Sequence, residues 1–356
     1  MIKRLCIFTT GFAHNRQGII KYLEKILPGE VELFFFVSKE CKGKYSSKRA
    51  KIIESKFNKY LCFFELRKFC RNNKIDRIMN VGSLPQEGFA MMLASMLSKT
   101  KFMCYLVINP FEFMSSKINK WSIKSFFQTI LLYPFLLFPE KIFVCSKDIT
   151  DICKKYAFFA RNKISQLPGT IDTDLFSPKD KKNIRKKFGI PLNKKVIISV
   201  GRIEYSKGAD LLFYLAEHNP EILFVLIGQL SKDYASKKKL KNIIFIERKS
   251  PQELSDYYNL ADLCICPSRA EGFGLVPREA MSCGTPAIVS DVLSLRMIEP
   301  AIKVQLNSEK IEKEMNNFFN LSTKEKKELS IKSRKYIINE SSYELCKNLY
   351  SSLLLN

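Results

Sequence analysis

The stretch Leu263-Cys-Ile-Cys-Pro-Ser-Arg-Ala-Glu-Gly-Phe-Gly-Leu-Val-Pro-Arg-Glu279 combines an apolar strand, a loop with two glycines and the start of a helix. Its four apolar residues at 263–266 predict the strand, and residues 276–282 predict the helix. A strand joined to a helix in this way is the repeating unit of a parallel sheet. The loop therefore lies at the carboxyl end of a parallel strand, where α/β folds bind ligands.

The same alternation continues on both sides of this stretch. Helical patterns separate most of the predicted strands, which lie at 2–10, 31–37, 77–81, 102–108, 142–145, 196–200, 222–227, 243–246 and 287–289. Two consecutive α/β sheets predict two Rossmann-like domains that face a cleft. We expect domains at 1-170 and 171-340, with a C-terminal helix at 341-356 returning to the first. The polar, lysine-rich stretch 168–195 is interpreted as a linker.

The net charge of the chain is strongly positive and unevenly distributed. It has 59 Lys and Arg against 35 Asp and Glu, which gives +24. Residues 1–170 hold 29 basic and 12 acidic side chains, so the first half carries +17 of this excess. Such asymmetry indicates an anionic partner: nucleic acid, a membrane surface or an anionic substrate. A solvated basic face without a partner is the alternative.

The eleven cysteines are odd in number and scattered, which favours buried reduced thiols and a cytoplasmic protein over a disulfide framework. No stretch reaches the roughly 18 uninterrupted apolar residues of a membrane-spanning helix. The apolar segment Trp121–Pro139 leaves two interpretations open. It forms either a buried helix or a helix that lies at a membrane interface between flanking lysines.

Two groups of residues carry the chemistry that the sequence predicts. Glu271 and Glu279 bracket the glycine-containing loop, and carboxylates accept hydrogen bonds from the hydroxyls of a sugar or a nucleoside. The glycines allow the backbone to approach a ligand, and amides at the helix start favour a phosphate. The loop Gly201–Gly208 contains Arg202 and Lys207, which together would place two positive charges beside a diphosphate.

Three stretches match, in order, a known family: Pro168–Phe176, Gly201–Gly208 and Glu271–Pro286. In these stretches the chain resembles glycosyltransferase family 4, retaining enzymes with the GT-B fold, of the bacterial surface-polysaccharide type. The resemblance implies that Arg202 and Lys207 hold the donor diphosphate. It also implies donor contacts for the remaining residues of the second half: Glu271 to the transferred sugar, Gly272, Phe273 and Gly274 to the sugar or phosphate, Glu279 to the ribose, and Arg248 and Lys249 to the base.

The family pattern also bears on metals and on the acceptor. No divalent metal is expected, although Asp172 and Asp174 form a DxD triplet. In the N-terminal half the resemblance is one of pattern only, and it implies that Gly11 lies near the donor phosphates. Many relatives have a histidine after the strand that corresponds to 102–108, a position where this chain has neither of its two histidines. The candidate acceptor-side residues are therefore His14, Asn109 and Glu112.

We expect a retaining enzyme that moves a hexose-type sugar from a UDP- or GDP-sugar to a hydroxyl of a membrane-associated glycan or lipid-linked acceptor, in surface polysaccharide or lipopolysaccharide synthesis. The expected catalytic residues are Glu271, Arg202 and Lys207, without a cofactor. The expected location is cytoplasmic, with the inner face of the plasma membrane as a peripheral site. The alternatives are an inactive GT-B relative that partners an active transferase, a GT-B epimerase or phosphorylase, and a basic nucleic-acid-binding protein, for which no recognisable module is present.

Overall fold

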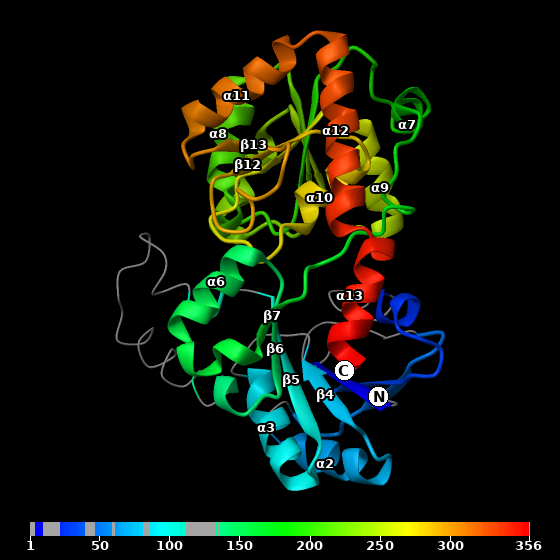
Figure 1. Ribbon diagram of the computed structural model, residues 1–356. Helices are drawn as coiled ribbons and strands as arrows, with labels where there is room; N and C mark the ends of the chain where they lie inside the picture. Colours follow the sequence, from blue (N-terminus) through cyan, green and yellow to red (C-terminus); the bar gives the residue numbers. More distant parts are fainter. Residues whose placement is uncertain are drawn as a thin grey trace. The chain divides into compact units, whose positions relative to one another are not determined.

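The computed structural model describes residues 4–9, 22–39, 47–58, 61–80, 86–107, 109–111, 133 and 135–355. The chain divides into two compact units (Figure 1). The first comprises Met1–Pro168 and Cys346–Asn356, and the second comprises Gly169–Leu345. The boundaries expected from the sequence, at 170 and 341, differ from these by two and five residues.

The first unit is built on a seven-stranded parallel sheet with the order β3-β2-β1-β4-β5-β6-β7. Its strands are β1 (Arg4–Thr9), β2 (Glu32–Val37), β3 (Lys51–Glu54), β4 (Arg77–Asn80), β5 (Lys101–Leu106), β6 (Lys141–Val144) and β7 (Ile164–Gln166). The helices described are α2 (Phe63–Asn72), α3 (Gln86–Ser98), α6 (Lys147–Tyr156) and the last part of α13 (Tyr343–Leu355). Strands β3 and β7 were not expected, because they are short edge strands with polar residues and lack an apolar run.

The second unit is built on a six-stranded parallel sheet with the order β10-β9-β8-β11-β12-β13. Its strands are β8 (Val196–Val200), β9 (Leu223–Ile227), β10 (Ile243–Ile246), β11 (Leu263–Cys266), β12 (Ala287–Ser290) and β13 (Ile302–Val304). Its helices are α7 (Lys181–Lys187), α8 (Ala209–His218), α9 (Pro251–Leu260), α10 (Leu275–Ser282), α11 (Ser308–Asn320), α12 (Thr323–Ser341) and the start of α13. One hydrophobic core lies on each face of this sheet, and Cys264 and Cys266 share a core, as expected for alternate strand positions.

The order of the strands reverses next to the first strand of each sheet. In the second unit, the chain runs from β8 outward through β9 to β10 and then returns to the other side of β8 with β11. The carboxyl ends of β8 and β11 therefore flank the topological switch point, where open α/β sheets bind ligands. Both central strands are followed directly by the loops that the sequence singled out.

Helix α7 corrects the interpretation of 168–195 as a linker. Asp180 caps this helix by accepting a hydrogen bond from the Lys182 amide at 2.9 Å. The side chain of Arg185 is buried and forms an ion pair of 2.8 Å with Asp262, besides donating to four backbone carbonyls. The segment was interpreted as a linker because it is polar and rich in lysine, but part of it forms a helix that one buried arginine holds against the rest of the unit.

The end of α13 packs on the first unit, in agreement with the sequence prediction. The Tyr350 ring meets Tyr22 edge to face at 4.9 Å, and its hydroxyl donates to the Pro168 carbonyl at 2.6 Å. Arg77 and Lys141, at the starts of β4 and β6, donate to carbonyls near the end of the helix.

Among the described residues, no helix is long and apolar enough to cross a membrane. Most of the segment 121–139 lies outside the described residues.

Candidate functional site

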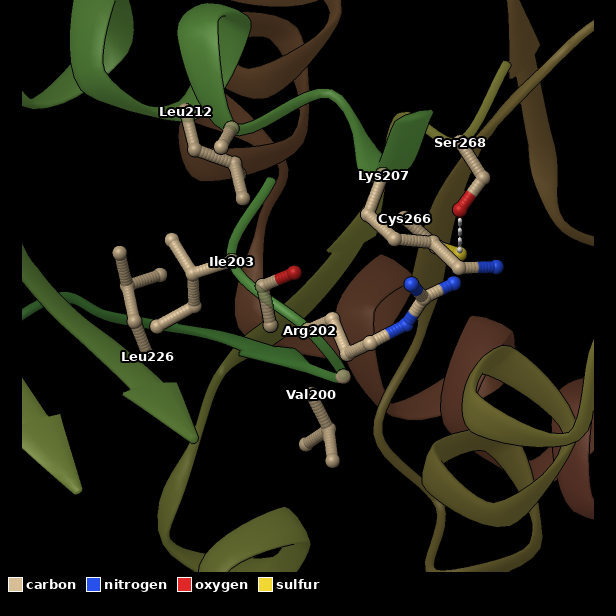
Figure 2. A pocket seen from close by; sticks show the side chains of 11 residues that line it. Val200, Arg202, Ile203, Lys207, Leu212, Leu226, Cys266 and Ser268 are labelled. Atoms are coloured by element: carbon tan, nitrogen blue, oxygen red, sulfur yellow. Dashed lines mark hydrogen bonds between the residues drawn. The ribbon is translucent and has the colours of Figure 1, made fainter. Parts of the chain in front are cut away.

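Two loops meet at the switch point of the second sheet. The first, Gly201–Gly208, follows β8, and the second, Pro267–Gly274, follows β11. Residues of both loops line a pocket, together with the ends of the two strands and the start of α8. Figure 2 shows the side chains of Arg202 and Lys207 extending to the same side of this pocket as the Ser268 hydroxyl.

Lys207 and Glu271, 64 residues apart in the sequence, form an ion pair. The Lys207 Nζ lies 2.6 Å from Glu271 Oε1, and the two side chains are 28% and 18% exposed. The Ser268 hydroxyl donates to the same carboxylate oxygen at 2.9 Å. The structure thus joins the cation assigned to the diphosphate and the carboxylate assigned to the sugar in one partly buried network, in which Ser268 is a member that sequence reasoning missed.

Arg202 lines the pocket, and its side chain is 65% exposed. Its Nη1 lies 2.9 Å from a carboxylate oxygen of Glu204, two residues further along the same loop. Sequence reasoning gave Glu204 no role, although it stands inside the motif. Glu204 is itself partly exposed, so solvent screens this pair and leaves the guanidinium available to an anion.

Two helices begin at this edge of the sheet, and each begins with a glycine in the left-handed region. Gly208 (φ +73°) precedes α8, and Gly274 (φ +74°) precedes α10. A Cβ on Gly208 would lie 2.2 Å from the Pro267 carbonyl oxygen, and a Cβ on Gly274 would lie 2.5 Å from the Leu295 side chain. The glycines therefore bring both helix N-termini, with their partial positive charge, to the site.

The side chain of Phe273 is part of the packing and lies away from solvent, with 8% exposed. The Arg278 guanidinium stacks on its ring at 3.9 Å and donates to its carbonyl oxygen. A Cβ on Gly169 would lie 2.4 Å from the same ring, so Gly169 is required for this contact. The resemblance assigned backbone amides of the loop to the ligand, and the buried Arg278, which sequence reasoning missed, fixes the backbone at that point.

Glu279 is a partly buried carboxyl group in α10. The Tyr258 hydroxyl donates to its Oε2 at 2.7 Å. Burial raises the pKa of Glu279 to about 7, while the Tyr258 hydrogen bond acts in the opposite direction.

Lys249, which was assigned to the base, forms an ion pair of 3.1 Å with Glu253 at the start of α9.

The candidates of the first unit are less well described. Gly11, His14 and Glu112 lie outside the described residues. Asn109 is buried, and its Oδ1 accepts a hydrogen bond from the Phe111 amide at 2.9 Å, which shapes the loop after β5. The acceptor-side assignments therefore stay predictions.

In the DxD triplet, Asp172 Oδ1 accepts a hydrogen bond from the Leu175 amide at 3.2 Å.

The chain was compared with known protein families and curated proteins. Residues 180–336 match the model of the glycosyl transferases group 1. A D-inositol 3-phosphate glycosyltransferase of Mycobacteroides abscessus is 34% identical over 164 residues, which cover 43% of this chain and 37% of that protein. A protein of the same name from Mycolicibacterium smegmatis is 30% identical, over 37% of this chain and 33% of its own length. The match thus spans about a third of the length of these curated relatives.

Solved structures resemble the chain over nearly its whole length. The sucrose-phosphate synthase of Thermosynechococcus elongatus matches with a TM-score of 0.82 and 16% identity, over 99% of this chain and 98% of its own. HepE of Anabaena, solved with UDP and glucose, matches with a TM-score of 0.79 and 13% identity over the full length of both chains. WaaG, a glycosyltransferase involved in lipopolysaccharide biosynthesis, matches with a TM-score of 0.75 and 14% identity, over 98% of this chain and 99% of its own.

At these identities the structural matches speak for the fold, and they confirm the two Rossmann-like domains of the GT-B class. The family match covers most of the second unit and includes the loops that hold Arg202, Lys207 and Glu271. The chain therefore has the GT-B fold, and the part of it at 180–336 is similar to the glycosyl transferases group 1.

Proposed function

We propose that this protein is a retaining glycosyltransferase that moves a hexose-type sugar from a UDP- or GDP-sugar to an acceptor hydroxyl. The observation that carries the proposal is the Lys207–Glu271 ion pair of 2.6 Å at the switch point of the second sheet. It brings a cation for the diphosphate and a carboxylate for the sugar within reach of one ligand. The solved complex of HepE with UDP and glucose supports a nucleotide sugar as the donor.

The charges at the site suit the departure of a nucleoside diphosphate. When the bond to the sugar breaks, negative charge gathers on the phosphate oxygens. Lys207, the exposed Arg202 and the N-termini of α8 and α10 then stabilise the transition state more than the ground state. Glu271 orients the sugar and supports the positive charge that develops at its ring. Transfer with retention places the acceptor hydroxyl on the same face as the leaving group.

We also propose that the reaction needs no divalent metal. The reason is that two cationic side chains line the pocket proposed for the diphosphate, and they would supply the positive charge that other transferases obtain from a metal ion. Turnover measured with excess EDTA should equal turnover in buffer alone. A loss of activity that Mg²⁺ or Mn²⁺ restores would contradict this part of the proposal.

Donor binding is best tested by the thermal stability of the full chain with UDP-, GDP-, ADP- and CMP-sugars. Binding at about 100 times Kd adds about 2.7 kcal/mol, so one UDP- or GDP-sugar should raise Tm by several degrees. Lys207→Ala and Arg202→Ala should each reduce this rise in Tm. Each should also lower turnover by about 10²–10³-fold. Glu271→Gln should keep the affinity for free UDP or GDP but lose turnover, because its expected contact is with the sugar.

Lys237→Ala is the matched control, since it breaks another Lys–Glu pair of the same unit, with Glu217. Proton spectra of the product should show that the anomeric configuration is retained. If no nucleotide sugar raises Tm, the proposal is wrong. Salt-dependent retention of DNA or RNA under these conditions would then favour the nucleic-acid alternative. Donor binding without turnover would favour an inactive relative.

For the acceptor, we propose a glycan or lipid-linked molecule on an anionic membrane surface at the cytoplasmic face. Support comes from the α2–α3 patch, which we define as five exposed apolar side chains: Phe57, Leu61, Phe64, Met96 and Leu97, each 42–58% exposed. Helices α2 and α3 lie side by side (Figure 1), and Arg67 Nε donates to the Leu97 carbonyl between them. The exposed Lys56, Lys68 and Lys99 accompany the patch, a combination typical of interfacial surfaces.

A flotation assay with vesicles of neutral and anionic phospholipid tests this surface. Phe57→Ser with Phe64→Ser should reduce binding to anionic vesicles. Leu192→Ser with Ile331→Ser, at apolar residues of the second unit that are at least as exposed, should not. Unchanged flotation of the Phe57/Phe64 variant would overturn the membrane part of the proposal.

A further inference from the structure

Arg269 bridges the two loops of the site. It stands in the loop after β11, two residues before Glu271. Its backbone amide donates to the Ser206 carbonyl at 2.9 Å, and its Nη1 donates to the Tyr205 carbonyl at 2.5 Å. One residue of the second loop thus holds the two residues that precede Lys207 in the first loop.

The same guanidinium also reaches the other side of Lys207. Its Nη1 and Nη2 lie 2.8 and 2.7 Å from the two carboxylate oxygens of Asp210, in the first turn of α8. Its Cζ lies 3.6 Å from the centre of the Tyr205 ring. Lys207 is therefore bracketed on both sides by contacts with Arg269.

These contacts differ from an ordinary surface ion pair. An exposed pair contributes little, since solvent screens it and both side chains lose freedom. The Arg269 side chain is only 18% exposed, and it combines a two-point fork with ring stacking, a geometry that an ammonium group does not reproduce. Asp210 also lies in the first turn of α8, where the helix N-terminus favours a negative charge, so we expect the fold to tolerate the loss of its partner.

We propose that Arg269 is a positioning residue for sugar transfer. It fixes the turn Tyr205–Lys207 against the loop after β11, so that Lys207 and Glu271 act on one donor molecule at a set separation. This inference rests on the proposed function, because it assigns the role of Arg269 through those two residues. A displacement of about 1 Å in such a site costs up to about 10²-fold in rate.

The experiment measures kcat and the donor KM for Arg269→Lys, Arg269→Ala and Asp210→Asn, together with Tm. Arg269→Lys should lower kcat about 10- to 100-fold, with a donor KM within about threefold and a Tm within a few degrees of the wild type. Asp210→Asn keeps one acceptor for the fork and should lose less. The double variant Arg269→Lys/Asp210→Asn should lose no more than Arg269→Lys, because both changes remove the same contact.

Lys237→Ala again serves as the matched control, with wild-type kcat expected. A kcat for Arg269→Lys and Arg269→Ala within twofold of the wild type overturns the inference. So does a loss of activity that follows the loss of Tm or of folded protein in all variants, since that reports a structural role only. The proposed function is judged separately. If the wild type neither binds nor turns over a nucleotide sugar, the proposed function is wrong, and the role of Arg269 that rests on it is wrong as well.

Discussion

Glu279 shows how the environment of one residue changes its chemistry. A carboxyl group in water is ionised at neutral pH, but burial raises the pKa of Glu279 to about 7. The Tyr258 hydroxyl, 2.7 Å away, partly offsets this by donating to the carboxylate. Between pH 6 and 8 the Glu279 carboxyl is therefore protonated in a part of the molecules and ionised in the rest. A ligand hydroxyl that donates to Glu279 favours the ionised form.

The stability of the free protein should depend on this proton. Below about pH 4 the carboxyl is protonated in the folded and the unfolded chain. As the pH rises towards 7 the unfolded chain loses the proton first, so the folded chain binds more protons and its free energy of unfolding falls. The loss is complete above the folded pKa. The Glu279→Gln variant has no proton to lose at this position. Its free energy of unfolding, relative to that of the wild type, should therefore increase by about 3 kcal/mol between pH 4 and pH 8.

Denaturation of both proteins across this pH range measures the difference. Tyr258→Phe removes the donor that lowers the pKa, so it should move the midpoint of the pH dependence above that of the wild type. If the wild type and Glu279→Gln lose or gain stability in parallel from pH 4 to pH 8, the carboxyl does not carry a raised pKa.

At the scale of an element, α7 depends on one side chain. The helix has seven residues, of which five are Lys or Arg, and it is too short to be stable by itself. Arg185 is 1% exposed and ties α7 to α9 and to the chain that leads into β8, through the carbonyls of Leu260, Leu192 and Lys194. Asp262, its ionic partner, also accepts from the Val196 amide at 2.8 Å.

We predict that Arg185→Met lowers the stability of the second unit by about 3–5 kcal/mol, because it leaves Asp262 and several carbonyls without their buried donor. Differential scanning calorimetry should show a lower transition temperature for that unit. Lys187→Met is the matched control on the same helix. Its side chain is 63% exposed and pairs with Asp256, so its transition should stay near that of the wild type. Equal effects of the two substitutions would contradict the role given to Arg185.

At the scale of the whole molecule, the chain passes from one unit to the other twice, after Pro168 and within α13 after Leu345. The last residues of α13 complete the core of the first unit, where Tyr350 and Leu354 are almost fully buried. The second unit has its own two cores, on the two faces of its sheet. Each unit therefore has a hydrophobic interior, but the first obtains part of its interior from the end of the chain.

Removal of residues 346–356 should consequently destabilise the first unit and spare the second. Hydrogen exchange should show faster exchange in β1, β4 and β5, with β8 and β11 protected as in the full chain. Tyr350→Phe removes the hydroxyl that hydrogen-bonds with the Pro168 carbonyl and with the Tyr105 side chain, and should cost about 1–2 kcal/mol. Unchanged protection of β1, β4 and β5 in the truncated chain would show that α13 does not complete this core.

Much of the fold, and the two loops of the candidate site, could be predicted from the sequence, because the responsible signals are local. The apolar runs of β8 and β11 predict strands, and glycines at 208 and 274 mark the sharp entries into α8 and α10. The edge strands β3, β7 and β13 were missed because they have only three or four residues, and the helix α7 was missed because its Arg185 is held by partners far away in the sequence.

The sequence by itself determined the alternation of strands and helices, the place of the two loops after β8 and β11, and the residue types that they present. Only the tertiary structure decided which of these residues meet. The sheet order brings β11 beside β8, which pairs Lys207 with Glu271 across 64 residues and joins Arg269 to Asp210 across 59. The physical reason is that strand and turn preferences act between neighbours in the chain, whereas ion pairing, burial and raised pKa values depend on what the folded sheet places within a few ångströms.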